Sequence, residues 1–130
     1  MSIVKTVFGR LMITLGAVFV AFSSSAQTYP QRPIKAIVPY AAGGFSDQAS
    51  RIIVEAMSRN LGQNIIIENR SGAAGTIAAD LVAKSPADGY TLLMGHSNSN
   101  AIAPFVLPKI PFNAATDFTP ITYVGYVPNV

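Results

Sequence analysis

The chain has 130 residues, with nine basic and six acidic side chains, a formal net charge of +3 and no cysteine. The lack of cysteine excludes disulfides, thiolate metal sites and thiol catalysis, so a packed core must stabilise the fold. The basic residues are scattered, whereas a nucleic-acid-binding face needs them clustered, so nucleic acid is excluded as a partner.

The first 26 residues have the pattern of a secretory signal peptide. Lys5 and Arg10 precede an apolar run of twelve residues, Leu11–Phe22, and the small residues Ser24-Ser25-Ala26 follow. That order is typical of a cleaved leader, and the run is shorter than the roughly 20 residues that span a bilayer. We therefore expect export and cleavage after Ala26. The mature chain then keeps seven basic and six acidic residues, a net charge of +1.

The mature chain alternates between predicted strands and predicted helices. An apolar run at Ile34–Pro39 predicts a strand, and apolar residues at helical spacing from Asp47 to Leu61 predict a helix that stops at Gly62. The β-branched run in Asn64–Glu68 predicts a second strand, covered on both faces. We expect these elements after it, in chain order: a helix over Ile77–Lys84, a strand over Tyr90–Gly95, a helix over Ala101–Leu107 capped by the polar residues His96–Asn100, an irregular connection over Pro108–Pro120, and a strand over Ile121–Val127.

This alternation predicts an α/β fold with a mainly parallel sheet flanked by helices. Ligands of such sheets bind beyond the carboxyl ends of the strands. The three strand-to-helix turns, residues 39–47, 69–76 and 96–100, all fall at that edge and are rich in Gly, Ser, Asn and Asp. A polar pocket is therefore expected there.

The first of these turns carries the strongest chemical signal. Gly43 and Gly44 permit backbone conformations that larger residues avoid, and Ser46 or Asp47 can cap the helix that follows. Free backbone N–H groups at the positive end of a helix predict a site for a small anion. Asp47 either steadies this turn or faces the ligand, and both readings stay open. We expect Phe45 to tuck under the turn.

Motifs for catalysis and cofactors are missing from the sequence. It contains no G-x-G-x-x-G, no G-x-x-x-x-G-K-[ST] and no G-x-S-x-G nucleophile elbow. His96 is the one histidine, and the acidic residues lie far from it in sequence, so a metal site is not expected. We interpret His96 as a capping or packing residue. No catalytic residue, cofactor or metal is therefore assigned.

Six stretches match one known family, in the family's order. They are Tyr29–Ile34, Ile37–Asp47, Leu61–Gln63, Glu68–Gly75, Ala87–Leu93 and Asp117–Ile121. Together they resemble the Bug-type (TctC-like) substrate-binding proteins of tripartite tricarboxylate transporters, over nearly all of residues 29–130.

The resemblance implies a two-domain periplasmic binding protein of type II. Residues 27–130 would form the N-terminal part of its first domain, with the second domain largely or wholly missing. The implied ligand is a small carboxylate: a tri- or dicarboxylate, an acidic amino acid or an aromatic acid. The implied partners are membrane permease subunits. The implied ligand-binding residues are Tyr40, Ala41, Ala42, Gly43, Gly44, Phe45, Ser46 and Asp47, with Gly72, Gly75, Ser97 and Asn98 matching more weakly.

Three alternatives stay open at this point. The same pocket could serve a ligand sensor that signals to a membrane partner. A hydrolytic enzyme could use the same sheet edge, with its nucleophile beyond Val130. The chain could also be a shortened remnant without binding activity. The turns of one domain favour an anion without choosing among carboxylates.

Overall fold

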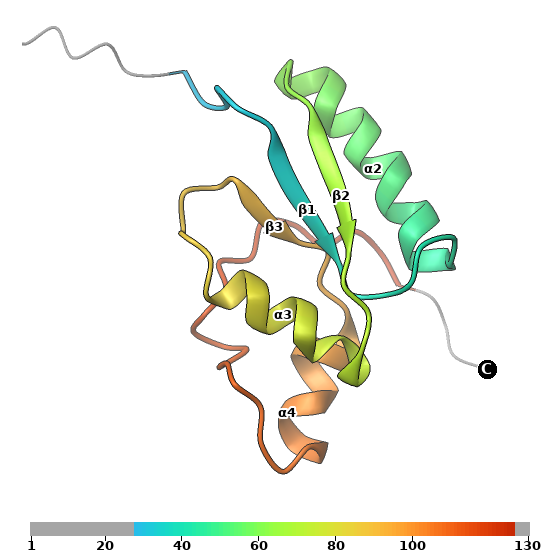
Figure 1. The fold of residues 1–130 in the computed structure, drawn as a ribbon, viewed down its shortest axis with the longest axis vertical. Coiled ribbons are helices and arrows are strands. Elements are labelled where there is room, and N and C mark those ends of the chain that lie inside the picture. The colour runs from blue at the N-terminus through green and yellow to red at the C-terminus, as the bar shows by residue number, and fades with distance from the viewer. Residues whose placement is uncertain (1–27, 127–130) are drawn as a thin grey trace, which may run out of the picture.

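A computed structural model of the protein describes residues 28–126, in which three parallel strands form one sheet (Figure 1). The strands β1 (Ile34–Val38), β2 (Ile65–Asn69) and β3 (Thr91–Leu93) lie in the order β2-β1-β3. The predicted α/β class with a parallel sheet is confirmed. The predicted signal peptide and its cleavage site lie outside the described residues.

Helical segments follow each strand and cover both faces of the sheet. Strands β2 and β3 lie on opposite sides of β1, and right-handed crossovers in opposite directions place their helices on opposite faces. The first helix packs on β1 and β2, and the second packs on β1 and β3 (Figure 1). The segments are α2 (Phe45–Leu61), the 3₁₀ turn η1 (Ala73–Gly75), α3 (Thr76–Ala83), the π-helical turn η2 (Asn98–Ile102) and α4 (Ala103–Val106).

The hydrophobic core lies where α2 meets the sheet. Ile34 and Ala36 of β1, Val54 of α2 and Ile65 of β2 form one cluster, and none is more than 6% exposed. Alternation along β1 turns Ile37 to the opposite face, where α3 packs, and Ile37 is fully buried. The central strand is therefore buried from both sides, which fixes the position of its carboxyl end.

Two strand predictions differ from the structure. Strand β2 lies at the edge of the sheet, and Ile66 is 48% exposed, so the expected cover on both faces is wrong for the described chain. Residues 121–126 form no strand, and Ile121 and Tyr123 are each 76% exposed; Val127 lies outside the described residues. An apolar sequence favours a strand, but a strand also needs a neighbouring strand that hydrogen-bonds to its backbone N–H and C=O groups.

The third helical segment begins earlier than predicted. The π-helical turn η2 starts at Asn98, and Ser97 already has helical backbone angles of φ −55° and ψ −39°. The polar residues 96–100 therefore form the first turn rather than a cap before Ala101. Strand β3 is shorter than the predicted Tyr90–Gly95.

Candidate functional site

The three strand-to-helix turns meet at the carboxyl edge of the sheet, and Gly75 joins them. Gly75 is buried at the end of the second turn. A Cβ placed on it would lie 3.1 Å from the Pro39 Cβ and 3.2 Å from the Ser99 Cβ. Its φ of +88° also favours glycine. Because Pro39 belongs to the first turn and Ser99 to the third, this close approach brings all three together.

The first turn presents backbone amides at the start of α2. Gly44 is the N-cap residue, and the first helical hydrogen bond runs from the Gln48 N–H to the Gly44 carbonyl at 3.0 Å. The N–H groups of Phe45 and Ser46 precede that bond, so the helix itself gives them no partner. Phe45 is 68% exposed, so the expectation that its ring tucks under the turn is wrong. This end of α2 has the geometry that favours an anion.

Asp47 steadies the first turn from inside the helix. It is 2% exposed, and its Oδ2 accepts hydrogen bonds from the Gly43 N–H at 2.9 Å and from the Arg51 Nε at 2.8 Å. Its Oδ1 accepts from the Asn69 Nδ2 at 2.9 Å. The prediction that Ser46 or Asp47 is the N-cap is wrong, because Gly44 takes that position and both residues lie within the first turn of the helix.

These contacts determine the charge of the Asp47 carboxyl. The hydrogen bond from Arg51, followed by those from Gly43 and Asn69, holds the pKa of Asp47 well below its ordinary value. The carboxylate in turn raises the pKa of the Arg51 guanidinium. The positive charge of Arg51 therefore balances the negative charge of Asp47. This pairing limits the repulsion between Asp47 and an anion that binds at the turn.

Asn69 is a site residue that the sequence analysis missed. It ends β2, and its Nδ2 donates to the Tyr40 carbonyl at 3.0 Å as well as to Asp47. Both partners can only accept, which fixes the orientation of the amide. The available signal was its place at the carboxyl end of a strand, but asparagine is also an ordinary turn residue.

The second turn has an unusual backbone. Gly72, Ala73, Ala74 and Gly75 have φ values of +129°, +45°, +54° and +88°. A left-handed conformation costs about 1–2 kcal/mol for a residue with a Cβ, so the two alanines hold local strain. Strain of this kind clusters at functional sites. Gly72 and both alanines are exposed, so the strained backbone faces solvent at the carboxyl edge.

His96 places the third turn against the first. Its ring packs edge-on against the ring of Tyr40, with centroids 4.9 Å apart. The Ser97 Oγ and the Asn98 N–H both lie 3.5 Å from the His96 Nδ1. The predicted packing role of His96 is confirmed. Ser97 and Asn98 themselves are exposed beside it.

The predicted ligand-binding residues share one edge but differ in exposure. Asp47 and Gly75 are buried, where they hold the turns together, while Tyr40 and Ser46 are partly exposed. The others are exposed: Ala41, Ala42, Gly43, Gly44, Phe45, Gly72, Ser97 and Asn98. Most of these side chains are small, so the edge offers a ligand mainly backbone groups.

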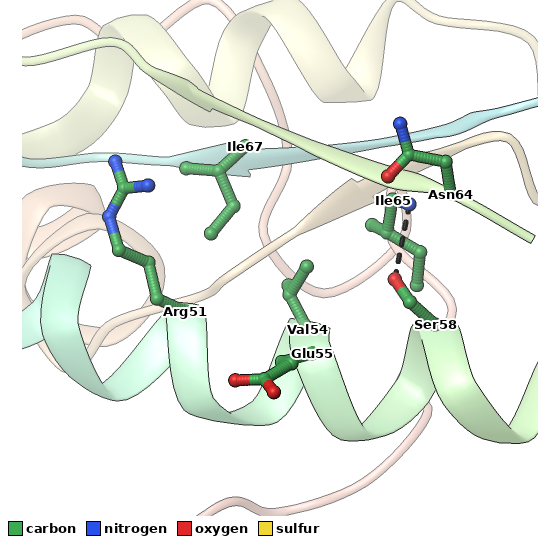
Figure 2. A pocket seen from close by; sticks show the side chains of 7 residues that line it. All are labelled: Arg51, Val54, Glu55, Ser58, Asn64, Ile65 and Ile67. Atoms are coloured by element: carbon green, nitrogen blue, oxygen red, sulfur yellow. Dashed lines mark hydrogen bonds between the residues drawn. The ribbon is translucent and has the colours of Figure 1, made fainter.

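A separate groove runs between α2 and the edge strand β2, away from the turns (Figure 2). Inside it the Ile65 N–H donates to the Ser58 Oγ at 3.2 Å. Its lining residues are Arg51, Val54, Glu55, Ser58, Asn64, Ile65 and Ile67. Across residues 28–126, no group of three or more His, Cys, Asp or Glu could hold a metal. No helix in that part of the chain is long and apolar enough to cross a membrane.

Solved structures that share this fold include a periplasmic transporter and two proteins with a bound carboxylate. A Rhodopseudomonas palustris protein solved with adipate is 42% identical, with a TM-score of 0.68 over 71% of this chain and 31% of its own. MatC from Rhodopseudomonas palustris, with bound malate, gives the same values. A structure described as a periplasmic transporter is 38% identical, with a TM-score of 0.64 over 66% of this chain and 29% of its own. The described part of the chain therefore shares the fold of 29–31% of each of these proteins.

The chain belongs to the tripartite tricarboxylate transporter family receptor (TctC) family, whose model matches residues 49–130. Protein BugT of Bordetella pertussis is 40% identical over 100% of this chain and 39% of its own length. A relative in Bordetella bronchiseptica is 40% identical over 89% of this chain and 36% of its own. The chain therefore spans less than two fifths of the length of these relatives, and the predicted resemblance to Bug-type proteins is confirmed.

Proposed function

We propose that the full-length protein captures a small carboxylate in the periplasm and delivers it to the membrane subunits of a tripartite transporter. The observation that supports this most directly is the pair of N–H groups, of Phe45 and Ser46, that the start of α2 leaves without a partner inside the helix. They lie in a chain 42% identical to proteins solved with adipate and with malate. The backbone amides of Phe45 and Ser46 would contact a carboxylate, with the rest of the first turn and Gly72, Ser97 and Asn98 beside them. Asp47 and Gly75 would support them from behind.

The energetics favour a second domain in the complete protein. A hydrogen bond to a charged group contributes about 1.5–3 kcal/mol, so two bonds from the first turn give roughly 3–6 kcal/mol. Association costs about 4 kcal/mol or more, and micromolar affinity needs about 8 kcal/mol net. We propose that residues 27–130 are the N-terminal part of the first domain. A second domain would close over the ligand and supply the missing contacts.

Thermal unfolding of the full-length mature protein tests the proposal. A panel of di- and tricarboxylates, acidic amino acids and aromatic acids is screened, with the neutral methyl ester of each hit as its control. A ligand at 100 times its Kd adds about 2.7 kcal/mol of stability, so at least one acid is expected to raise the Tm while its ester does not. Stabilisation by no acid, or equally by acid and ester, contradicts the proposal.

Two companion measurements test the remaining parts of this proposal. The binding protein should return its ligand chemically unchanged, so turnover of a bound acid that disappears on His96→Ala would contradict a purely binding role. Export should leave a protein whose N-terminus is Gln27, which intact mass spectrometry of a periplasmic extract can establish. A mature protein that retains residues 1–26 would contradict the proposed cleavage.

A further inference from the structure

The side chain of Asn69 ties together both ends of the first turn. Its Nδ2 lies 3.0 Å from the carbonyl oxygen of Tyr40, where the turn begins, and 2.9 Å from the Oδ1 of Asp47, just beyond its end. The middle of the turn is held as well, because the Gly43 N–H donates to the other oxygen of Asp47 at 2.9 Å. One amide nitrogen and one carboxylate therefore hold the turn at three points.

This connection also joins two different strands. Asn69 is the last residue of β2 and Tyr40 follows the end of β1, so the bridge runs across the carboxyl edge of the sheet. The neighbouring backbone bond from the Arg70 N–H to the Val38 carbonyl, at 2.8 Å, places the two strand ends in register. The paired strands therefore hold the backbone of Asn69 in place, and its side-chain amide can determine where the first turn lies.

We infer that Asn69 is a positioning residue: acting through Asp47, it sets the direction of the N–H groups at the start of α2. The inference rests on the proposed function of that turn. Removing the Asn69 donor leaves the Oδ1 of a 2% exposed carboxylate without this partner. The freed carboxylate then shifts, and the Gly43 N–H, which is bonded to it, shifts with it.

The substitution Asn69→Asp tests this with little change in shape. It replaces the donating nitrogen by an acceptor next to the Asp47 Oδ1. Arg51 keeps Asp47 ionised, and two adjacent carboxylates repel each other, so the carboxyl introduced at position 69 takes up a proton as the pH falls. A shared proton restores a hydrogen bond between residues 69 and 47. The variant should therefore have a loosened turn at pH 8 and, at pH 5, a turn in which Asp47 is held again although the bond to the Tyr40 carbonyl is not restored.

The matched control is Asn64→Asp, which makes the same chemical change at the opposite end of β2, where Asn64 is exposed. Full-length wild type and both variants are titrated with malate and with adipate from pH 5 to pH 8. In parallel, NMR follows the Gly43 amide proton in the ligand-free proteins. At pH 8 we expect Asn69→Asp to bind about tenfold more weakly than Asn64→Asp, and at pH 5 within about threefold. Its Gly43 resonance should move over the same pH range.

The outcomes separate this inference from the proposed function. If wild type binds neither acid, capture of these acids is contradicted, and the Gly43 resonance of the ligand-free variants still decides the role of Asn69. A Gly43 resonance in Asn69→Asp that matches the control at every pH overturns the inference. Weak binding without recovery at pH 5 also overturns it, because general damage to the fold would not be reversed by a shared proton.

Discussion

Small side chains at the carboxyl edge of the sheet would leave recognition of the proposed ligand to backbone groups. The N–H groups that begin α2 belong to Phe45 and Ser46, which follow Gly43 and Gly44, and the buried carboxylate of Asp47 holds the backbone before them in place. A carboxylate ligand would therefore be bound by peptide dipoles rather than by a lysine or arginine. Arg51 already neutralises Asp47 through a 2.8 Å ion pair, which leaves the partial positive charge of the helix end for the ligand.

Proline at the first helical position tests the role of a single N–H group. Phe45 is that position, and proline is tolerated there because its N–H has no partner within the helix. Phe45→Pro removes the donor and the ring, whereas Phe45→Ala removes only the ring. Since a hydrogen bond to a charged group contributes about 1.5–3 kcal/mol, we expect roughly 10- to 150-fold weaker carboxylate binding for proline than for alanine. Calorimetric titration measures the difference, and equal affinities would contradict a role for this N–H.

The pH dependence of thermal stability tests whether the buried carboxylate of Asp47 stabilises the fold. Asp47 has a pKa far below its ordinary 3.8, so it stabilises the fold above that pH, and this contribution is lost as the pH falls further. Asp47→Asn should be less stable than wild type at neutral pH, and its Tm should decline less between about pH 4 and pH 2. The control is Glu55→Gln, which removes an exposed carboxylate from the same helix. A wild-type decline that persists unchanged in Asp47→Asn would contradict this assignment.

Among the secondary-structure elements, the three turns form one unit because their backbones approach closely at Gly75. The first turn also meets the second through Asn69, and it meets the third through the packing of His96 on Tyr40. Sheet order explains this arrangement: β1 lies between β2 and β3, so the turn after β1 has a neighbour on each side.

Alanine at position 75 should disturb this junction. Gly75→Ala forces a Cβ to within 3.1 Å of Pro39 and 3.2 Å of Ser99, in addition to the strain of a left-handed φ. Gly62→Ala is the control, because Gly62 also has a positive φ but has nothing within 4 Å of the added Cβ. Left-handed strain costs about 1–2 kcal/mol in both variants, and overpacking adds about 1–3 kcal/mol for Gly75 alone. Denaturant unfolding should show that difference, and equal losses would contradict the close-packed junction.

The spacing of apolar residues and the positions of glycines predicted those helices and turns that depend on nearby residues in the sequence. Helical spacing and Gly62 located α2 and its end, and the glycine turns follow β1 and β2 as the sequence predicted. Features that depend on neighbours were not predictable in this way. Ile66 is exposed because β2 is an edge strand, and Ile121 is exposed because none of the described strands pairs with its segment. Asn69 was missed because the acceptors of its side chain lie 22 and 29 residues away along the chain.

For the molecule as a whole, the chain contains one side of the proposed binding site. It spans 39% of BugT, and the described part leaves the apolar side chains of Tyr123 and Tyr126 76% and 80% exposed. Exposed large apolar groups on neighbouring residues mark surfaces that other parts of a protein cover. We propose that a second domain closes over the turns and covers the ligand.

A fragment of residues 27–130 should therefore bind much more weakly than the full-length protein. Two hydrogen bonds from the first turn support only about millimolar affinity at best once the cost of association is subtracted. Contacts from a closing domain should bring the full-length protein to about micromolar affinity. Parallel titrations with the same acid make the comparison. A fragment that binds as tightly as the full-length protein would contradict the need for closure.

The most direct test of the central claim is a crystal structure of the full-length protein with its bound carboxylate. We predict that a carboxylate oxygen lies about 2.9 Å from the backbone nitrogen of Phe45 or Ser46, at the start of α2. We also predict that Asp47 keeps its hydrogen bonds to Gly43 and Asn69 behind the ligand. A carboxylate bound elsewhere, such as in the groove between α2 and β2, with the first turn unoccupied, would contradict the claim (Figure 2).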